Sequence, residues 1–340
     1  MHMSDALLSV AVGTTMNVVS TGAIGYSVSK IKKYDLEETK IPMMGVMGAF
    51  IFAAQMINFT IPVTGSSGHI GGGILLAALL GPYPAVITLS CVLLIQCLFF
   101  ADGGLLALGC NIFNIAILPC LIAYPLIYRN ILKKTITKRR ITVAAMAAVV
   151  IGLQLGAFGV VTQTLLSGIT ELPFQAFAAV MQPIHLAIGI VEGIVTAAVL
   201  CFIYNIRKEI IQNALGFGLD QKAPMKKLYI ILISTTIFIG GFLSWYASSN
   251  PDGLEWSISK VTRESEISNE SVVHDAVQKL QEVTTLLPDY SLKEDITSDG
   301  KLGTSLSGII GGGITLAIAM AFGSLIMVYK KARNRKYNEI

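Results

Sequence analysis

The first two residues, Met1 and His2, together offer several nitrogen donors for one metal ion. A free N-terminal amine, the amide nitrogen of residue 2 and the ring Nδ1 of a His at that position can close a five-membered and a six-membered chelate ring. The amide must lose its proton, which Ni²⁺ and Cu²⁺ promote and harder ions such as Mg²⁺ do not. A tetragonal set of nitrogen donors favours Cu(II) or Ni(II) over zinc, which prefers tetrahedral coordination. A His after Met is common in proteins, so this dipeptide alone says little.

His69 is the second candidate donor, and it lies in the glycine-rich run Gly65–Gly73. Glycine lets the backbone approach a neighbour closely and adopt non-helical conformations. An irregular entry into a membrane helix is tolerated only within protein or beside a cavity. His69 is therefore either a metal ligand at such an entry or a residue that caps the start of the next helix. Its own surroundings in the sequence do not decide between the two.

Two further ionisable residues, His185 and Glu192, lie seven positions apart in one apolar segment and so share a helical face. Ionisable side chains at membrane depth are costly and usually functional. Two interpretations remain open, which are hydrogen-bonded support of the metal ligands and a structural network between helices. The partners that we expect for this pair are the polar residues of other helices, Gln55, Asn58, Asn111 and Asn114.

The segments that must position these residues are long and apolar. Of the 340 residues, 53% are hydrophobic and 14% are charged, whereas soluble domains carry roughly 25% charged residues. A bilayer core about 30 Å thick is crossed by ~20 apolar residues in a helix. We therefore predict an all-α, polytopic membrane protein with a seven-segment core and two additional transmembrane helices. The expected segments are 6–29, 41–59, a short buried half-helix at 70–80, 85–100, 105–128, 141–167, 177–206, 228–246 and 306–329.

The basic residues sort by loop. If the N-terminus is outside, 20 of the 25 Lys and Arg residues fall in inside loops or in the C-terminal tail, as the positive-inside rule requires. We expect a multi-pass protein of a bacterial or archaeal cell membrane, with an extracytoplasmic N-terminus and a cytoplasmic C-terminus. Lys30, the first Lys, follows the first apolar segment, which argues against a cleaved signal peptide. This sorting also argues against nucleic acid as a partner, and it places His69 on the same face as Met1.

The other five Lys and Arg residues lie in one outside loop, about residues 247–305, which is acidic overall. Apolar residues at helical spacing predict an amphipathic helix over 271–285 in this loop, with His274 solvated. We expect two domains, a metal-binding membrane domain at 1–215 and a companion module at 216–340, joined by a linker that contains Gly and Pro.

Several other chemistries are disfavoured by the sequence. The five cysteines are scattered through apolar segments without a CxxC pair, which argues against a disulfide framework or a Cys-based zinc site. The methionines of segment 41–59 could form a Cu(I) path, although Met is also a common packing residue. An intramembrane enzyme that used His185 and Glu192 would lack a nucleophile at the same level. No GxxxxGK[ST] motif is present, so active transport would draw its energy from a partner or from an ion gradient.

Several motifs, in order along the chain, resemble the substrate-binding (S) components of nickel and cobalt energy-coupling-factor transporters, the CbiM/NikM family. The motifs are Met1–Ser9, Phe52–Phe59, Gly65–His69, Asp102–Asn111 and His185–Gly193, and the resemblance covers about residues 1–210. It implies that the ion is held by the amine of a retained, unblocked Met1, by the amide and ring nitrogens of His2, and by His69. Ala6 departs from the Gly that is typical of the family at this position, which affects a neighbour of the site and not a ligand.

The stretches Asn250–Trp256 and Leu286–Tyr290 resemble the small companion subunit of the NikN type, with its PDGLE motif, here fused to the S component. The resemblance implies nickel somewhat more than cobalt as the transported substrate. It also implies a transmembrane coupling (T) subunit and cytoplasmic ATP-binding subunits as partners, and no ATPase site in this chain. The alternative is a proton-coupled secondary carrier, which needs acidic residues within its helices. The residues expected to support the ligands are Asn58, Asn111, His185 and Glu192.

Overall fold

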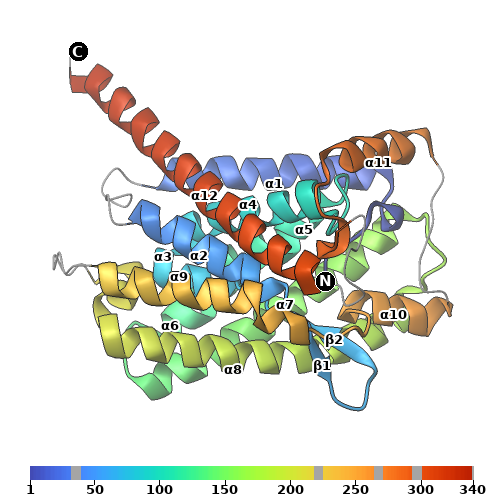
Figure 1. Ribbon diagram of the computed structural model, residues 1–340, viewed down its shortest axis with the longest axis horizontal. Helices are drawn as coiled ribbons and strands as arrows, with labels where there is room; N and C mark the ends of the chain where they lie inside the picture. Colours follow the sequence, from blue (N-terminus) through green and yellow to red (C-terminus); the bar gives the residue numbers. More distant parts are fainter. Residues whose placement is uncertain (32–39, 218–224, 264–270, 293–300, 339–340) are drawn as a thin grey trace.

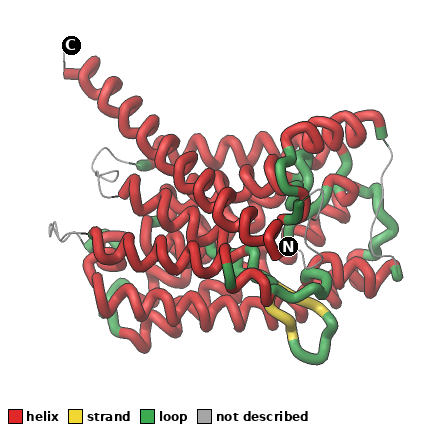
Figure 2. Tube along the Cα trace, viewed as in Figure 1, coloured by secondary structure: helices red, strands yellow, loops and turns green. Residues whose placement is uncertain are grey.

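The protein is all-α, as predicted, and its helices run roughly side by side (Figures 1 and 2). The computed structural model describes residues 1–31, 40–217, 225–263, 271–292 and 301–338. Within these ranges the only sheet is a small antiparallel hairpin of β1 (Phe59–Ile61) and β2 (Ser66–Gly68). The hairpin lies at the end of the molecule that also holds the outer loop.

Each of the expected apolar segments contains a helix, although the helix of segment 41–59 ends at Gln55 and Phe59 begins β1. Among the described residues, five helical stretches are long and apolar enough to cross a membrane by length and composition, and α2 is a shorter apolar helix. The helices are α1 (Val10–Lys30), α2 (Lys40–Gln55), α3 (Gly73–Leu80), α4 (Pro82–Phe100), α5 (Leu108–Asn111) continuing through η2 (Ile112–Tyr128) into α6 (Arg129–Leu132), α7 (Lys138–Ser167), α8 (Phe174–Ala214), α9 (Lys226–Gly241) continuing into η3 (Leu243–Tyr246), and α12 (Lys301–Asn338).

Local signals explain where these helices begin and end. The Thr137 side chain caps α7 by accepting from the amide of Arg140, and Gly168 ends the helix with φ of 63°. Helix α4 begins with Pro82, whose missing N–H costs nothing in a first turn.

The segment η2 is a π-helix with Pro119 and Pro125 inside it. Proline removes a backbone donor from a helix interior, and wider turns are one way to accommodate such an interruption. Helix α3 packs closely against η2, because a Cβ on Gly73 would meet Pro119 at 2.8 Å. All eight residues of α3 are buried, as expected for a half-helix held within protein.

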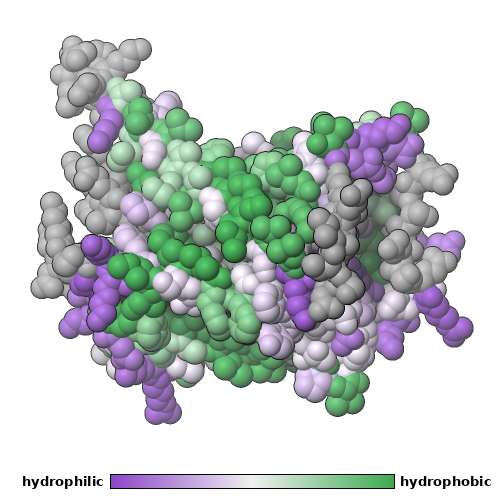
Figure 3. All heavy atoms as spheres, viewed as in Figure 1, coloured by the Kyte–Doolittle hydropathy of each residue, from purple (hydrophilic) through white to green (hydrophobic). Residues whose placement is uncertain are grey.

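The part of the chain that we expect to form the companion module contributes α9 and α12, which pack against α2 and against each other. The two helices approach at Gly240 and Gly308, where an added Cβ on Gly308 would lie 2.3 Å from the carbonyl oxygen of Gly240. Such small-residue crossings let membrane helices bring their backbones together. Hydrophobic side chains cover the middle of the face seen in Figure 3, with hydrophilic ones gathered toward the two ends.

The outer part of the companion module forms α10 (Gly253–Thr262), α11 (Val272–Thr284) and η4 (Pro288–Tyr290). Helix α11 lies beside the N-terminal η1 (Asp5–Leu7), whereas α10 packs against α8 and β2. Helix α11 matches the expected amphipathic helix. The expectation that His274 is solvated is wrong. Its ring is buried, and Nε2 donates to the carbonyls of Asp5 at 3.1 Å and Leu8 at 3.0 Å.

Candidate metal-binding site

The N-terminal residues are held inside the protein. The backbone of Met3 is bonded at both of its polar groups, because its amide donates to Asn111 Oδ1 at 2.7 Å and its carbonyl accepts from Asn111 Nδ2 at 3.1 Å. The same carbonyl accepts from the amide of Gly104 at 2.9 Å. Asn111, one of the expected supporting residues, therefore fixes the segment that carries Met1 and His2.

The amine of Met1 lies 3.2 Å from Nε2 of His69 and forms an ion pair with the carboxylate of Asp252. At a metal–nitrogen distance of about 2.0–2.1 Å, two neighbouring donors of a square-planar site are about 2.9 Å apart. The amine and the His69 ring are therefore spaced nearly as two neighbouring ligands of one ion would be.

The His2 ring lies beside that of His69. The two rings stack with their centroids 5.0 Å apart and an angle of 16° between their planes. Nδ1 of His2, the atom that would close the six-membered chelate ring, faces Oδ1 of Asp102 at 3.2 Å. An ion bound by Nδ1 would take the place of this contact.

Both rings are suited to bind metal because they are neutral. Burial, and to a smaller extent the charge of the Met1 amine, lowers the pKa of His2 and of His69 to about 3. A neutral imidazole presents the lone pair that a metal ion requires. Burial alone would raise the pKa of the Asp252 carboxyl, but the adjacent amine and His69 hold that pKa well below its usual range.

The hairpin and the glycine run bring His69 to this position. Gly68 passes so close to α8 that an added Cβ would lie 2.6 Å from the side chain of Ile188. After His69, the Gly72 amide donates to Glu192 Oε1 at 2.9 Å. The cap of α3 is Gly72, with φ of 80°, and not His69, so the capping interpretation of His69 does not hold.

We expected His185 and Glu192 to pair with the polar side chains of other helices, and that expectation is wrong, because both bond to backbone groups. Glu192 bonds the backbone of the glycine run, and His185 Nδ1 donates to the carbonyl of Met181 at 2.8 Å. This bond leaves the lone pair of the ring on Nε2, which has no hydrogen-bond partner among the described residues. Asn58 lies outside the site, and its carbonyl accepts from the amide of Ser248 at 2.7 Å.

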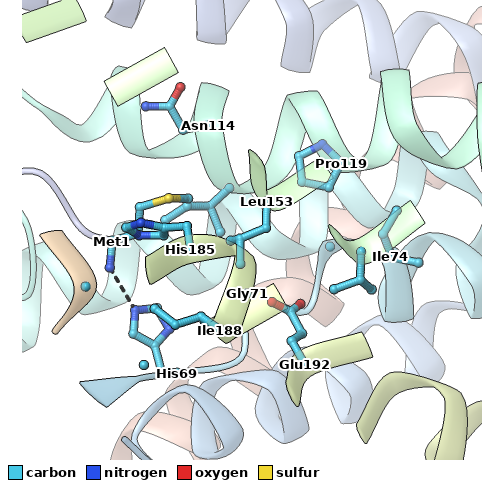
Figure 4. Close-up of a pocket in the computed structure, with 15 residues that line it drawn as sticks. Met1, His69, Gly71, Ile74, Asn114, Pro119, Leu153, His185, Ile188 and Glu192 are labelled. Carbon is cyan, nitrogen blue, oxygen red and sulfur yellow. Dashed lines mark hydrogen bonds between the residues drawn. The ribbon is translucent and has the colours of Figure 1, made fainter. Parts of the chain in front are cut away.

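A cavity of about 30 Å³ begins at Met1 and His69 and reaches Glu192 (Figure 4). A water molecule needs roughly 10–15 Å³ measured in this way, so the cavity has room for about two water molecules. Its polar lining groups come from Met1, His69, Asn114, His185 and Glu192. The expected site residues Met1 and His69 thus share one space with the expected supporting residues His185 and Glu192.

Three acidic or phenolic residues at the site were not selected from the sequence. Asp102 faces His2, Tyr290 donates to Asp102 Oδ2 at 2.5 Å, and Asp252 contacts the amine. All three lie in motifs that carried the family resemblance, which was the available signal. Within the described parts of the chain, no group of three or more His, Cys, Asp and Glu side chains is arranged to hold a metal ion. An ion here would therefore depend on backbone nitrogens.

The fold first defines a class, the all-α polytopic membrane proteins. A crystal structure described as a truncated transition metal transporter matches with a TM-score of 0.53 and 28% sequence identity, over 61% of this chain and 99% of that one. A second, described as a transition metal transporter, matches with a TM-score of 0.54 and 27% identity, over 61% and 94% of the two chains.

The family follows from the sequence. The cobalt uptake substrate-specific transmembrane region (CbiM) matches residues 2–210, and the PDGLE domain matches residues 226–327. The chain belongs to the CbiM family and carries a fused PDGLE domain. It is a membrane component of nickel or cobalt transport.

Two relatives illustrate the two arrangements within the family. A putative fused nickel transport protein NikMN of Archaeoglobus fulgidus is 32% identical over 323 residues, which are 94% of this chain and 97% of the relative. The putative cobalt transport protein CbiM 2 of Methanocorpusculum labreanum is 32% identical over 230 residues, 65% of this chain and 96% of the relative.

Proposed function

We propose that this chain is the substrate-binding (S) component of an ATP-driven energy-coupling-factor importer. It captures Ni²⁺, or Co²⁺, through the amine of Met1, the amide and ring nitrogens of His2, and His69. The observation that carries the proposal is the spacing of 3.2 Å between the amine and His69 Nε2, with the His2 ring stacked alongside. Four nitrogen donors in one plane suit Ni(II).

The fused arrangement supports nickel over cobalt as the substrate. The relative that matches 94% of this chain is named a putative fused nickel transport protein, whereas the relative named a putative cobalt transport protein matches 65% of it. The ion is the transported substrate and not a resident cofactor. Asn111 and Glu192 support the ligands by fixing Met3 and the glycine run.

The proposal includes partners. The sequence has no nucleotide-binding Walker motif, so the energy comes from cytoplasmic ATP-binding subunits through a transmembrane coupling (T) subunit. The sorting of basic residues supports an extracytoplasmic N-terminus and a cytoplasmic C-terminus in the cell membrane. The two family matches, 2–210 and 226–327, support a division into a metal-binding domain at 1–215 and a companion module at 216–340.

The test is nickel uptake by cells that express the chain with its transport partners. Addition of two residues before Met1, or His69→Ala, abolishes uptake, because each removes a donor from the ion. The same extension after Ile340 is the matched control and leaves uptake unchanged. Uptake at the wild-type rate by the N-terminally extended chain would show that the amine is not a ligand.

A proton-coupled carrier is distinguished by a second measurement. Glu192 is a buried acid in a membrane-spanning helix, as such a carrier needs, but its carboxylate is bonded to the backbone of the glycine run. Uptake by the chain without ATP-binding subunits, at the rate of the whole complex, would favour the carrier. We expect uptake to depend on those subunits.

A further inference from the structure

The motif of the companion module is docked beside the strand that leads to His69. The amide of Ser67 donates to the carbonyl of Pro251 at 2.8 Å, and Ser67 Oγ donates to the carbonyl of Asn250 at 2.8 Å. Trp256 Nε1 donates to the carbonyl of Thr64 at 3.0 Å. These three hydrogen bonds hold the motif against the hairpin. Ser67, which makes two of them, lies two residues before His69.

Gly253 permits this close approach. A Cβ at this position would lie 2.8 Å from the side chain of Ile188 and 3.1 Å from Cε1 of His185. The motif is thus seated between the hairpin and α8, at the mouth of the cavity that Met1 and His69 line.

The two carboxylate oxygens of Asp252 have separate roles. Oδ1 accepts from the amides of Leu254 at 2.7 Å and Glu255 at 2.9 Å, and so caps α10. The Glu255 carboxylate accepts from the Asp252 amide at 3.0 Å and completes a capping box. Because Oδ1 is held by two amides, Oδ2 is directed at the amine of Met1.

The amine of Met1 is positioned by few hydrogen-bond partners. Its recorded partners in the described structure are His69 Nε2 and Asp252 Oδ2. Asn111 fixes Met3, but rotation about the backbone of Met1 could still carry the amine away from His69. Fixing the backbone of one residue costs conformational entropy, which an ion would otherwise have to offset when it binds.

We propose that Asp252 is a positioning residue for the metal-ligating amine, so that the companion module completes the ion site from the outer face. The inference rests on the proposed function, because it assumes that the amine is a ligand. It assigns a specific task to the acidic residue of the fused motif, namely to hold the amine within ligand distance of His69.

The charge of Asp252 does not by itself decide between the states with and without the ion. A protonated amine carries one positive charge. A divalent ion that has displaced one proton from the amine and one from the amide also leaves one positive charge at the site. The carboxylate therefore stabilises both states by similar amounts. What Asp252 changes is the position of the Met1 amine. An amine already held beside His69 favours binding of the ion.

The test is calorimetric titration of the purified full chain with Ni²⁺. In Asp252→Asn the amide oxygen keeps the cap of α10, since Asn and Asp are equally good caps. The amide NH₂ group then faces the amine, and two donors meet. We expect affinity to fall about tenfold or more, in line with about 1.4 kcal/mol of lost positioning, with the number of sites per chain unchanged.

A merely structural role would give a different result, because partly misfolded protein lowers the number of sites and leaves the affinity of the remaining sites unchanged. Asp252→Ser, which keeps a capping hydroxyl and has no second oxygen, is the second variant, and we expect it also to weaken binding. Asp275→Asn removes one exposed carboxylate from the first turn of α11 and is the matched control.

The outcomes separate the two proposals when His69→Ala is titrated in parallel. Loss of binding in His69→Ala with wild-type affinity in both Asp252 variants overturns the role of Asp252 and leaves the proposed ligands in place. Wild-type affinity in all three variants overturns both. Loss in the Asp252 variants alone would make Asp252 a ligand in its own right, which also contradicts a positioning role.

Discussion

In α4 of the N-terminal region, 78% of the most apolar window is buried within the protein, whereas in α12 of the companion module the share is 33%. Both helices are long and apolar, but α4 is surrounded by other helices and α12 lies mainly against α2 and α9. Membrane helices gain little by exchanging lipid contacts for one another. The membrane part of the companion module is therefore attached along one side only.

The outer part of the companion module makes the opposite kind of contact. It reaches the N-terminal region through polar groups, which are the carboxylate of Asp252, the phenol of Tyr290 and the ring of His274. Each of these lies at or beside the segment that carries Met1 and His2. The comparison teaches that the module reaches the candidate site through a few directional bonds, which are made by residues beyond its long apolar helices.

The largest effect that we expect comes from the N-terminal side of this comparison. Glu192→Ala leaves the buried Gly72 amide without its acceptor, which costs about 1–3 kcal/mol, and frees the glycine run after His69. Affinity for Ni²⁺, measured by calorimetry, falls about tenfold or more. Glu192→Gln keeps an acceptor oxygen and retains most of the affinity, and Glu171→Ala, at an exposed loop acid, is the control. If Gln were as damaging as Ala, the charge of Glu192 and not its hydrogen bond would be the important property.

An intermediate effect is expected from overpacking on the companion side. Gly253→Ala places a methyl group against Ile188 and His185, and such overpacking typically costs about 1–3 kcal/mol. Part of this cost is relieved if the motif moves away from β2, so we expect a several-fold loss of Ni²⁺ affinity and faster proteolysis of the outer loop. Gly241→Ala, where the nearest atom lies at 3.7 Å, is the matched control. Unchanged affinity with a displaced loop would show that docking of the motif is not needed for binding.

The smallest effect concerns Tyr290. Tyr290→Phe removes the hydroxyl that donates to Asp102, while the ring keeps its stacking on Phe100, at 5.0 Å between centroids. A hydrogen bond contributes about 0.5–1.5 kcal/mol, so the affinity for Ni²⁺ should fall only a few-fold. Tyr246→Phe, at an exposed tyrosine of the same module, is the control. A loss as large as that of Glu192→Ala would mean that Asp102 holds the His2 ring more firmly than its distance of 3.2 Å suggests.

Most of the fold could be predicted because membrane helices depend on length and apolar content, which the sequence displays directly. The hairpin β1–β2 was missed because segment 41–59 reads as one apolar run, although α2 ends at Gln55 and the chain then turns back on itself. The polar residues Gln55 and Asn58 are isolated within this run, and periodicity alone does not place a helix end at them.

The candidate site, like the fold, has residues that the sequence could indicate and contacts that it could not. Met1, His2 and His69 were candidates because of their donor atoms, and the family resemblance named them as ligands. The bond between Asn111 and Met3 places Asn111 beside the N-terminal segment. The contact of Asp252 with the amine could not be predicted, because it depends on how a loop of a separate segment docks. His274 was misjudged for the same reason, since a His in an acidic loop is usually solvated unless another segment covers it.

The contacts that join the outer loop to the N-terminal segment connect residues far apart along the chain. The bond from His274 to Asp5 spans 269 positions, the Met1–Asp252 pair spans 251, and the Tyr290–Asp102 bond spans 188. Contacts of such separation carry the largest loop-closure entropy and form late in folding. We therefore expect helix insertion and packing of neighbouring helices to come first, and these contacts at the mouth of the cavity to form among the last. Variants that slow this closing step would accumulate a chain with its helices inserted and its outer loop still undocked.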